Sequence, residues 1–183
     1  LLNLTFFIFS HYKMIIEKID GELTQIANVA PDIIGKDFFE MEHSKGKITP
    51  EENAKNARIL SEYAKKMGAV YVYTIALKNG ELYYTSSSST DEEWQVGDVT
   101  PYFYSLSEYG DSNIEILKSK AANLKPVAIT GSDSYGNFRS VYIPLKNSRG
   151  EINIVGADYR LADINRVILT AAIFALLNML YIV

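Results

Sequence analysis

The side chains that most often carry catalysis or bind metals are scarce in this sequence. Its 183 residues include two histidines, His11 and His43, and no cysteine. A serine hydrolase brings together a serine, a histidine and an acid, and a metal site needs ligands at recognisable spacings. Neither histidine stands in such a pattern, and no glycine-rich nucleotide loop follows a predicted strand. The sequence therefore predicts no catalytic residue, no metal site and no cofactor.

Binding chemistry is better represented, by two opposite charges on neighbouring predicted strands. β-forming residues over 137–145 and 151–159 flank a short turn and predict an antiparallel pair. The expected register puts Arg139 opposite Asp158. The two side chains would then either form a cross-strand ion pair or read a zwitterion together, with Arg139 holding a ligand carboxylate by a bidentate pair. The sequence leaves both alternatives open.

Aromatic residues gather in a long polar stretch, residues 86–124. Segments of this length in compact domains often carry function. Trp94, Tyr102 and Tyr104 within it suggest a binding site with aromatic walls. Each of the three has a structural alternative, which is to pack in the core or to lie on the surface.

A β-hairpin precedes that stretch. Its predicted strands, 70–77 and 81–86, are separated by Asn79-Gly80, the strongest two-residue turn signal. The register of such a hairpin puts Tyr73 and Tyr84 on the same face of the sheet, where they become candidate ligand contacts. The run of four serines after the hairpin is predicted to be a solvated strand end, because it lacks the Gly-Lys partner of a phosphate site.

Three helices are predicted around these strands. Apolar residues over 12–30 recur every three or four positions, which indicates a helix with one apolar seam, broken at Pro31. This seam would pack either on the domain's own sheet or against a second copy in a dimer stalk. A second helix begins after Thr49, with a capping box and a proline at its first position, and ends at Gly68. A third helix is expected near 114–122.

Composition indicates one folded, acidic domain. Apolar residues make up 48% of the chain and charged residues 22%, and the formal net charge is -4. A chain of this length holds one domain of ordinary size, and its apolar fraction excludes wholesale disorder. No global basic field is present, which argues against nucleic acid as a partner.

Both ends of the chain are free of acidic and basic side chains, over residues 1–10 and 167–183. The second segment would form a helix about 25 Å long, close to the bilayer core of about 30 Å. We expect 1–10 to be the end of a first transmembrane helix and 167–183 to be the start of a second, both truncated. The alternative is a soluble protein in which both segments are internal core helices.

The order of these elements and several motifs resemble a known family. The segments YVYTIALKNGELYYTSSS, KPVAIT and FRSVYIPLKNSRGEINIVGADY are similar to those of the PAS-like sensor modules called Cache or PDC domains. The resemblance covers about residues 10–166. It implies an α+β fold with an antiparallel five-stranded sheet and a long N-terminal helix, bracketed by the truncated transmembrane helices. The expected divisions are a membrane-proximal stalk helix over 11–30 and one sensor domain over 31–166.

The resemblance also implies a function. Such domains are extracytoplasmic sensors of bacterial or archaeal transmembrane receptors, and their ligand binds between the sheet and the insertion that follows the hairpin. In amino-acid-sensing relatives the residue that matches Asp158 accepts the ammonium group, and Gly156 would let the ligand approach the backbone. Carboxylate-sensing relatives often carry an arginine where this chain has Thr100. The ligand-binding residues expected here are Tyr73, Tyr84, Trp94, Tyr102, Tyr104, Arg139 and Asp158.

The expected partners follow from the same resemblance. They are a small molecule of the amino-acid, amine or carboxylate class, a membrane, and a second copy of the chain, with residues 11–166 outside the cytoplasm. The signal would pass through the last strand into the second membrane helix and on to an output domain such as a kinase, a cyclase or a chemotaxis domain. No enzymatic activity is expected of this segment. The competing interpretation is a ligand-free PAS-like module that binds a protein partner or dimerises.

Overall fold

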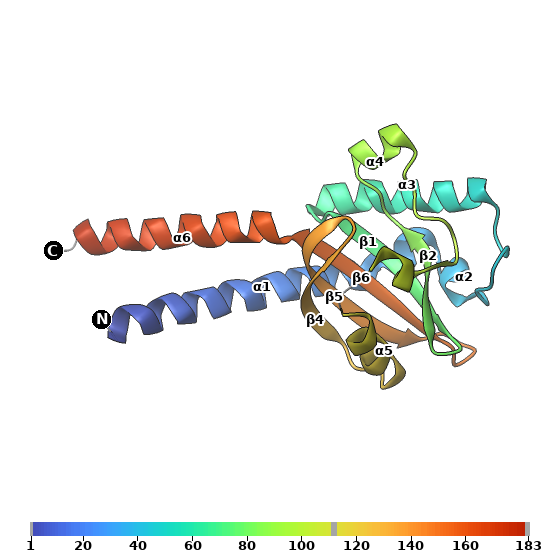
Figure 1. Ribbon diagram of the computed structural model, residues 1–183, viewed down its shortest axis with the longest axis horizontal. Coiled ribbons are helices and arrows are strands. Elements are labelled where there is room, and N and C mark those ends of the chain that lie inside the picture. The colour runs from blue at the N-terminus through green and yellow to red at the C-terminus, as the bar shows by residue number, and fades with distance from the viewer. Residues whose placement is uncertain (1, 111–112, 182–183) are drawn as a thin grey trace.

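Helices surround an antiparallel sheet in the order that the sequence predicts (Figure 1). The computed structural model describes residues 2–110 and 113–181. The first half of the fold contains helices α1 (Leu2–Ile34), α2 (Lys36–Glu40) and α3 (Pro50–Met67) and strands β1 (Tyr71–Lys78) and β2 (Glu81–Ser87). The insertion contains α4 (Asp91–Val96), β3 (Tyr104–Ser105), the 3-10 helix η1 (Leu106–Tyr109) and α5 (Ile114–Ala122). The chain continues through β4 (Val127–Asp133), β5 (Gly136–Lys146), β6 (Ile152–Arg160) and α6 (Leu161–Tyr181).

The sheet has six strands in the order β3-β2-β1-β6-β5-β4, one more than expected. The additional strand is β3, which pairs with β2 through Tyr83 opposite Ser105 and Tyr84 opposite Tyr104. A two-residue edge strand carries no alternating pattern that sequence analysis could detect. The α+β class and the antiparallel arrangement are confirmed.

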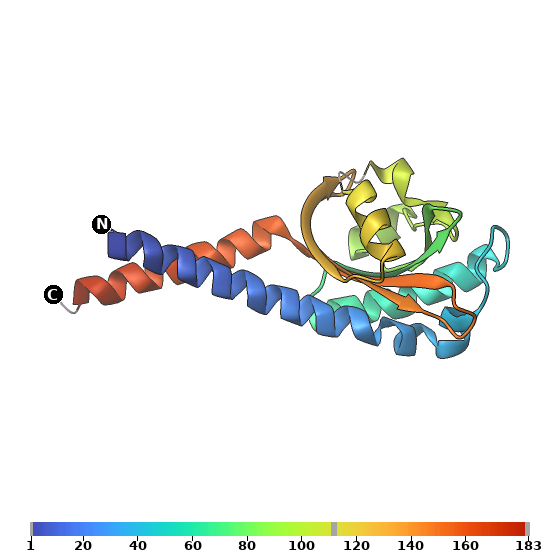
Figure 2. The ribbon, with the colours of Figure 1, turned by 90° about the horizontal axis from the view of Figure 1, so that it is seen from below.

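Helices cover both faces of this sheet (Figure 2). Helices α1, α2 and α3 lie on one side, whereas α5 and the rest of the insertion lie within the curve of the other side. Each side has its own apolar core. The core under α1 and α3 includes Leu23, Ile26, Leu60, Val72 and Val155. The core under α5 includes Ile75, Leu82, Leu106, Leu117 and Ile154.

Helix α1 packs on the sheet with only one of its two halves, and the predicted dimer stalk stays a prediction. Ile19, Leu23 and Ile26 are buried against the sheet, whereas Tyr12 is 47% exposed on the half that protrudes (Figure 1). The predicted break at Pro31 is wrong, since the helix continues to Ile34. A proline in the last turn removes few backbone hydrogen bonds, and the core contacts of that turn hold it.

The capping signals of α3 and the bounds of α5 are confirmed. The Thr49 hydroxyl accepts a hydrogen bond from the backbone N–H of Glu52 at 3.2 Å, and the Glu52 carboxylate accepts one from the backbone N–H of Thr49 at 2.8 Å. Gly68 ends the helix with φ +75°, in the left-handed region that glycine tolerates. Helix α5 covers the predicted range.

Strand registers were predicted with unequal success. The hairpin pairs Ile75 with Tyr84, as predicted, and its register shifts at a β-bulge beyond that pair. The β5–β6 register is one residue away from the predicted one, so that Arg139 pairs with Tyr159 and Asp158 with Ser140. A one-residue slip moves side chains to opposite faces of a sheet, and the predicted meeting of Arg139 with Asp158 is therefore wrong.

The protruding ends of α1 and α6 run side by side away from the sheet, and both termini lie at the same end of the molecule (Figures 1 and 2). Several apolar side chains of α6 are exposed, among them Val167, Leu169 and Phe174. Within the described ranges, no helix combines the length and the apolar character needed to cross a bilayer. Part of the transmembrane prediction falls on Leu1, Ile182 and Val183, which lie outside the described residues.

Candidate functional site

A polar, aromatic cavity of about 30 Å³ lies on the face of the sheet away from α1. It is enclosed by strands β1, β2 and β6, by the insertion around α4 and η1, and by the β4–β5 turn. This volume is enough for about one water molecule. Among the residues that the structure describes, its walls include five tyrosines, four carboxylates and four hydroxyl side chains: Tyr71, Tyr73, Tyr84, Tyr109, Tyr135, Glu93, Asp98, Asp133, Asp158, Ser87, Ser88, Ser89 and Thr100.

A second chamber of about 20 Å³ adjoins the first. Tyr84, Asp133 and Asp158 line both chambers and thus separate them. The outer wall of the second chamber comes from β4, β5 and the segment before α5: Asn113, Ile129, Gly131, Ser132, Phe138, Ser140 and Tyr142. Movement of the three shared side chains would join the chambers into one larger site.

Tyr73 and Asp158 form the buried centre of the site. The Tyr73 hydroxyl donates a hydrogen bond of 2.8 Å to Oδ1 of Asp158, and the two residues are 2% and 7% exposed. Burial raises the pKa of Tyr73 well above its usual value, and the charge of Asp158 raises it further. The phenol therefore stays protonated and occupies an oxygen of the carboxylate that the family resemblance assigns to a ligand ammonium group.

Gly156 makes room for this tyrosine. A Cβ atom at residue 156 would lie 2.1 Å from Cε2 of Tyr73, far inside van der Waals contact. The expectation that Gly156 brings a ligand to the backbone is therefore wrong for this arrangement, because the Tyr73 ring fills that space.

Two further tyrosines donate to carboxylates at the edge of the first chamber. The Tyr71 hydroxyl donates to Glu93, and the Tyr135 hydroxyl donates to Oδ1 of Asp98 at 3.3 Å. Burial is the main cause that raises the pKa of both phenols, so both remain protonated donors. We call these two pairs, together with the Tyr73–Asp158 pair, the tyrosine–carboxylate cluster.

The tyrosine rings also contact one another in series around the chambers. Ring centroids are 6.2 Å apart for Tyr71 and Tyr135, 5.2 Å for Tyr135 and Tyr109, 5.7 Å for Tyr109 and Tyr84, and 5.6 Å for Tyr84 and Tyr73. These are edge-to-face contacts, the arrangement that aromatic pairs prefer. Residues from four separate segments of the chain thus form one aromatic wall.

Three of the seven predicted site residues, Tyr73, Tyr84 and Asp158, meet at these chambers, and the other four lie elsewhere. Trp94 faces an open cleft of about 460 Å³ between α3 and α4. Its indole N–H donates to the Ser61 hydroxyl at 3.1 Å, and the Arg58 guanidinium lies 4.3 Å from its ring centroid. Tyr104 contacts the Tyr109 ring from outside the chamber walls.

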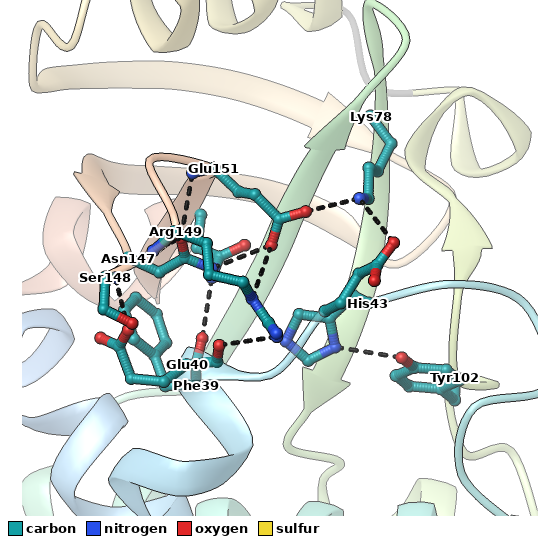
Figure 3. Close-up of polar contacts among 11 residues, drawn as sticks. Phe39, Glu40, His43, Lys78, Tyr102, Asn147, Ser148, Arg149 and Glu151 are labelled. Carbon is teal, nitrogen blue, oxygen red and sulfur yellow. Dashed lines mark hydrogen bonds and ion pairs between the residues drawn. The ribbon is translucent and has the colours of Figure 1, made fainter.

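Tyr102 belongs to a different polar cluster, next to His43 in the α2–α3 loop (Figure 3). That loop lies at the end of the domain away from the termini (Figure 1). The Tyr102 hydroxyl lies 3.0 Å from Nδ1 of His43, which is buried. Close to His43, Lys78 forms an ion pair of 2.6 Å with Glu151 (Figure 3). Arg149 donates to the backbone carbonyl of Glu40 at 3.1 Å and completes this group. We call Glu40, His43, Lys78, Arg149 and Glu151 the distal junction.

Arg139 lies on the α1 side of the sheet. Its Nε and a terminal nitrogen donate to the two carboxylate oxygens of Asp20 at 2.7 and 2.6 Å. The side chains of this bidentate pair are 16% and 25% exposed. Arg139 thus joins β5 to α1, at the point where the helix leaves the domain, and neither alternative predicted for it with Asp158 is realised.

Sequence reasoning missed several residues of the chamber walls. Tyr71, Tyr109 and Tyr135 come from three distant segments, and Glu93 carries a helix-capping signal that hides its second role as an acceptor for Tyr71. The prediction of a solvated serine run is also wrong, because Ser86–Ser89 are all buried. Among the described residues, no group of three metal-ligating side chains is placed to hold a metal ion.

Known proteins share this fold. No protein-family model and no curated protein matches the chain by sequence. The structure of the E. coli DcuS sensor domain matches it with a TM-score of 0.56 at 12% identity, over 84% of this chain and 96% of that one. The chain therefore has the fold of the Cache (PDC) sensor domains, as the resemblance predicted.

Two chemoreceptor structures match over a smaller part of their length. The sensory domain of Campylobacter jejuni Tlp3 matches with a TM-score of 0.40 at 13% identity, over 84% of this chain and 65% of that one. The ligand-binding domain of the Pseudomonas aeruginosa PAO1 amino-acid chemoreceptor PctC, in complex with GABA, has a TM-score of 0.46 at 12% identity, over 86% of this chain and 62% of that one. The chain thus spans less than two thirds of these two domains.

Proposed function

We propose that this chain is the extracytoplasmic small-molecule-sensing domain of a transmembrane signal-transduction receptor. Its ligand binds in the two adjoining chambers, between the sheet and the insertion. The observation that carries the proposal is a polar and aromatic site between the sheet and the insertion. It lies on the face of the sheet that the insertion covers. Aromatic rings and polar groups that converge on one cavity are features of small-molecule sites, in which the polar groups fix the orientation of the ligand.

Ligand entry requires the site to open. The chambers of about 30 and 20 Å³ are separated by three side chains, and each is too small for an organic ligand. Tyr135, in the β4–β5 turn, covers one side through its contacts with Tyr109 and Asp98. A ligand that displaces this cover and the Tyr73–Asp158 hydrogen bond would shift the population toward an open state.

Two connections lead from the site toward the termini. Strand β6 carries Asp158 and runs directly into α6, so a displacement of Asp158 acts on the second predicted membrane helix. Strand β5 begins next to Tyr135 and carries Arg139. The bidentate ion pair of Arg139 with Asp20 connects this strand to α1. Opening of the site would then alter the relation between the two protruding helices, which is a mechanical signal.

Anchoring and dimerisation belong to the same proposal. The protruding halves of α1 and α6 expose Tyr12, Met14, Val167, Leu169 and Phe174. Exposed apolar surface of this kind marks a membrane or protein contact. We assign the outer ends to the bilayer and the seam next to the domain to a second copy of the chain, with an output domain on the cytoplasmic side.

A thermal-unfolding screen tests the proposal. The full chain, in a mild detergent, is screened against amino acids, amines and carboxylates, because a ligand that binds the folded state raises the melting temperature. We expect at least one compound to raise it, and a Tyr135→Ala variant to lose that response while Tyr12→Ala, on the protruding part of α1, retains it. If no compound binds, the competing interpretation of a ligand-free interaction module is favoured, with the pocket filled by its own tyrosines.

A further inference from the structure

We propose that the ligand is a small organic ammonium ion that carries no carboxylate group. This inference rests on the proposed function and narrows it, since it separates amines from the amino acids and carboxylates that the sequence leaves equally open. Three features of the site carry it: the charges on its walls, the position of Arg139, and the tyrosine rings.

The described walls of both chambers carry acidic groups and no basic ones. Glu93, Asp98, Asp133 and Asp158 line the chambers, and their described walls include no lysine, arginine or histidine. Arg160 acts on the Tyr71 hydroxyl by its charge and by a hydrogen bond, but it lines the adjacent open cleft and not the described chamber walls. A ligand carboxylate between the described walls would therefore lose its hydration among carboxylates, with no cationic side chain in those walls to pair with, which is a costly form of burial.

The arginine that could have held a ligand carboxylate is engaged elsewhere. Arg139 lies across the sheet from the chambers and forms two hydrogen bonds of 2.7 and 2.6 Å with Asp20. The one-residue difference between the predicted and observed β5–β6 register removes it from the face of Asp158. The zwitterion arrangement inferred from the sequence therefore retains its ammonium half, Asp158, and loses its carboxylate half.

The tyrosines suit a cation in two ways. Their rings form a continuous wall through Tyr71, Tyr135, Tyr109, Tyr84 and Tyr73, and an aromatic face attracts an ammonium ion. Their hydroxyls also occupy carboxylate oxygens in this closed state, as in the Tyr73–Asp158 pair. An ammonium N–H that replaces a phenol O–H at such an oxygen exchanges a neutral donor for a charged one, and charge-assisted hydrogen bonds are the stronger kind.

A matched series of four-carbon ligands tests this specificity. Butylammonium, GABA and butyrate have similar length and differ in charge, and 1,4-diaminobutane adds a second ammonium group. Binding to the full chain in a mild detergent is measured by calorimetry at pH 7 and two salt concentrations. We expect at least one of the two cations to bind, GABA to bind at least about tenfold more weakly, and butyrate to give no heat of binding.

Variants locate the binding site. Asp98→Asn removes one carboxylate from the chamber wall, and because Asp98 is exposed, the substitution should not disturb folding. We expect the affinity for the cation to fall about fivefold. The control Glu51→Gln removes an exposed carboxylate far along the sequence in the first turn of α3 and should leave affinity unchanged. Equal losses in both variants would indicate non-specific attraction and would overturn the inference.

The outcomes separate this inference from the proposed function. If GABA or butyrate binds as tightly as the cations, or if only a neutral or anionic metabolite from the wider screen binds at the chambers, the cation inference is wrong and the sensing proposal stands. If neither the series nor the wider screen yields a ligand, both are wrong. Cation binding that Asp98→Asn weakens and Glu51→Gln does not supports both.

Discussion

The tyrosine–carboxylate cluster and the distal junction are two polar groups at different ends of one sheet, and they hold their carboxylates in opposite ways. In the cluster, Asp158 accepts a hydrogen bond from a neutral phenol, Tyr73. In the distal junction, Glu151 lies 2.6 Å from the Lys78 ammonium group and 3.8 Å from the Arg149 guanidinium group (Figure 3). The pKa of Glu151 is accordingly lowered, chiefly by the hydrogen bond from Lys78.

The difference indicates what each region can do. In the distal junction, positive and negative side chains satisfy one another, so the region joins α2, β1 and the β5–β6 turn without need of a further partner. In the cluster, each phenol that donates to a carboxylate is neutral, so the hydrogen bond itself adds no positive charge beside that carboxylate. The proposed binding site and the ion pairs of the distal junction thus lie at different ends of the same strands.

Alkaline pH should destabilise the cluster. We expect this to lower the free energy of unfolding more than any of the changes described below. Tyr71, Tyr73 and Tyr135 have raised pKa values in the folded chain, so the unfolded chain loses these protons first as the pH rises above about 10. Their contribution to stability is therefore present below pH 10 and lost above it. At pH 11 the loss of the Tyr73 contribution should lower the free energy of unfolding by about 1.4 kcal/mol. Tyr71 and Tyr135 are better screened by solvent and should each add less, so the three together lower it by at most about 4 kcal/mol.

Urea unfolding at pH 9 and pH 11 measures this loss, and phenolate absorbance reports the ionisation directly. Lysines also titrate in this range, so the control is Tyr73→Phe, which removes the fully buried phenol and should reduce the difference between the two pH values by about 1.4 kcal/mol. An unchanged difference in that variant would contradict the assignment to the cluster.

Gly156→Ala tests how tightly the cluster is packed. The new methyl group would lie 2.1 Å from the Tyr73 ring, so the ring or the strand must move. We expect the free energy of unfolding to fall by about 3 kcal/mol, as in other overpacked cores. The matched control is Gly21→Ala on α1, where a Cβ meets nothing within 4 Å and should stabilise the helix by up to about 1 kcal/mol. Equal effects at the two glycines would show that Tyr73 does not need the space.

The features that sequence analysis predicted correctly are those determined by residues close together in the sequence. The capping box at Thr49, the αL glycine at Gly68 and the Asn79-Gly80 turn are each complete within a few positions, and they fixed α3 and the hairpin. Helix α5 was found from its local pattern in the same way. Local signals of this kind do not depend on the rest of the fold, which is why they can be read without it.

The site was only half predicted because it depends on pairing between distant strands. The β5–β6 loop contains one more residue than expected: the Asn147 side chain accepts hydrogen bonds from the backbone N–H groups of Arg149 and Glu151, and the strands pair again at Lys146 and Ile152. That one residue reversed the face of Arg139. No nearby pattern distinguishes this loop from the shorter turn that the predicted pairing of Arg139 with Asp158 requires.

The buried serines show a similar dependence on tertiary structure. Ser88 accepts a hydrogen bond from the backbone N–H of Val72, and the backbone N–H of Ser89 donates to Ser61 on α3. Polar residues with partners of this kind can be buried at little cost. These partners of Ser88 and Ser89 come from β1 and α3, so the serine run alone gives no sign of them.

Arg139 and Asp20 form an ion pair on the side of the sheet opposite the cluster. As in the distal junction, the carboxylate is balanced by a positively charged side chain. Both side chains are largely buried and are joined by two hydrogen bonds. Arg139→Ala should therefore leave the Asp20 carboxylate poorly solvated and without its partner, and should lower the free energy of unfolding by about 2 kcal/mol. The control Lys13→Ala removes an exposed pair with Glu17, worth at most about 0.5 kcal/mol. Urea unfolding measures both. If Arg139 contacted the ligand, Arg139→Ala would weaken binding of butylammonium or GABA beyond its effect on stability, and the comparison between the two regions would fail.

Mild acid should weaken the distal junction and spare the cluster, with the smallest of these effects. Burial lowers the pKa of His43 from 6.5 to about 4, with smaller and opposing contributions from Glu151, which raises it, and from Lys78 and Arg149, which lower it. Between these values the unfolded chain binds a proton that the folded chain does not, so stability is lost as the pH falls through 6.5 toward 4.

At pH 5.5 the loss relative to pH 7.5 should be about 1.4 kcal/mol. This pH lies above the ordinary pKa of carboxylates, which therefore contribute little to the change. Urea unfolding at the two pH values measures it. His43→Gln, which keeps a polar group near Tyr102, should remove most of the dependence, whereas His11→Gln on the protruding part of α1 should retain it. A dependence that persists in His43→Gln would mean that the acid-sensitive group lies outside the distal junction, and the division of roles between the two ends of the sheet would have to be redrawn.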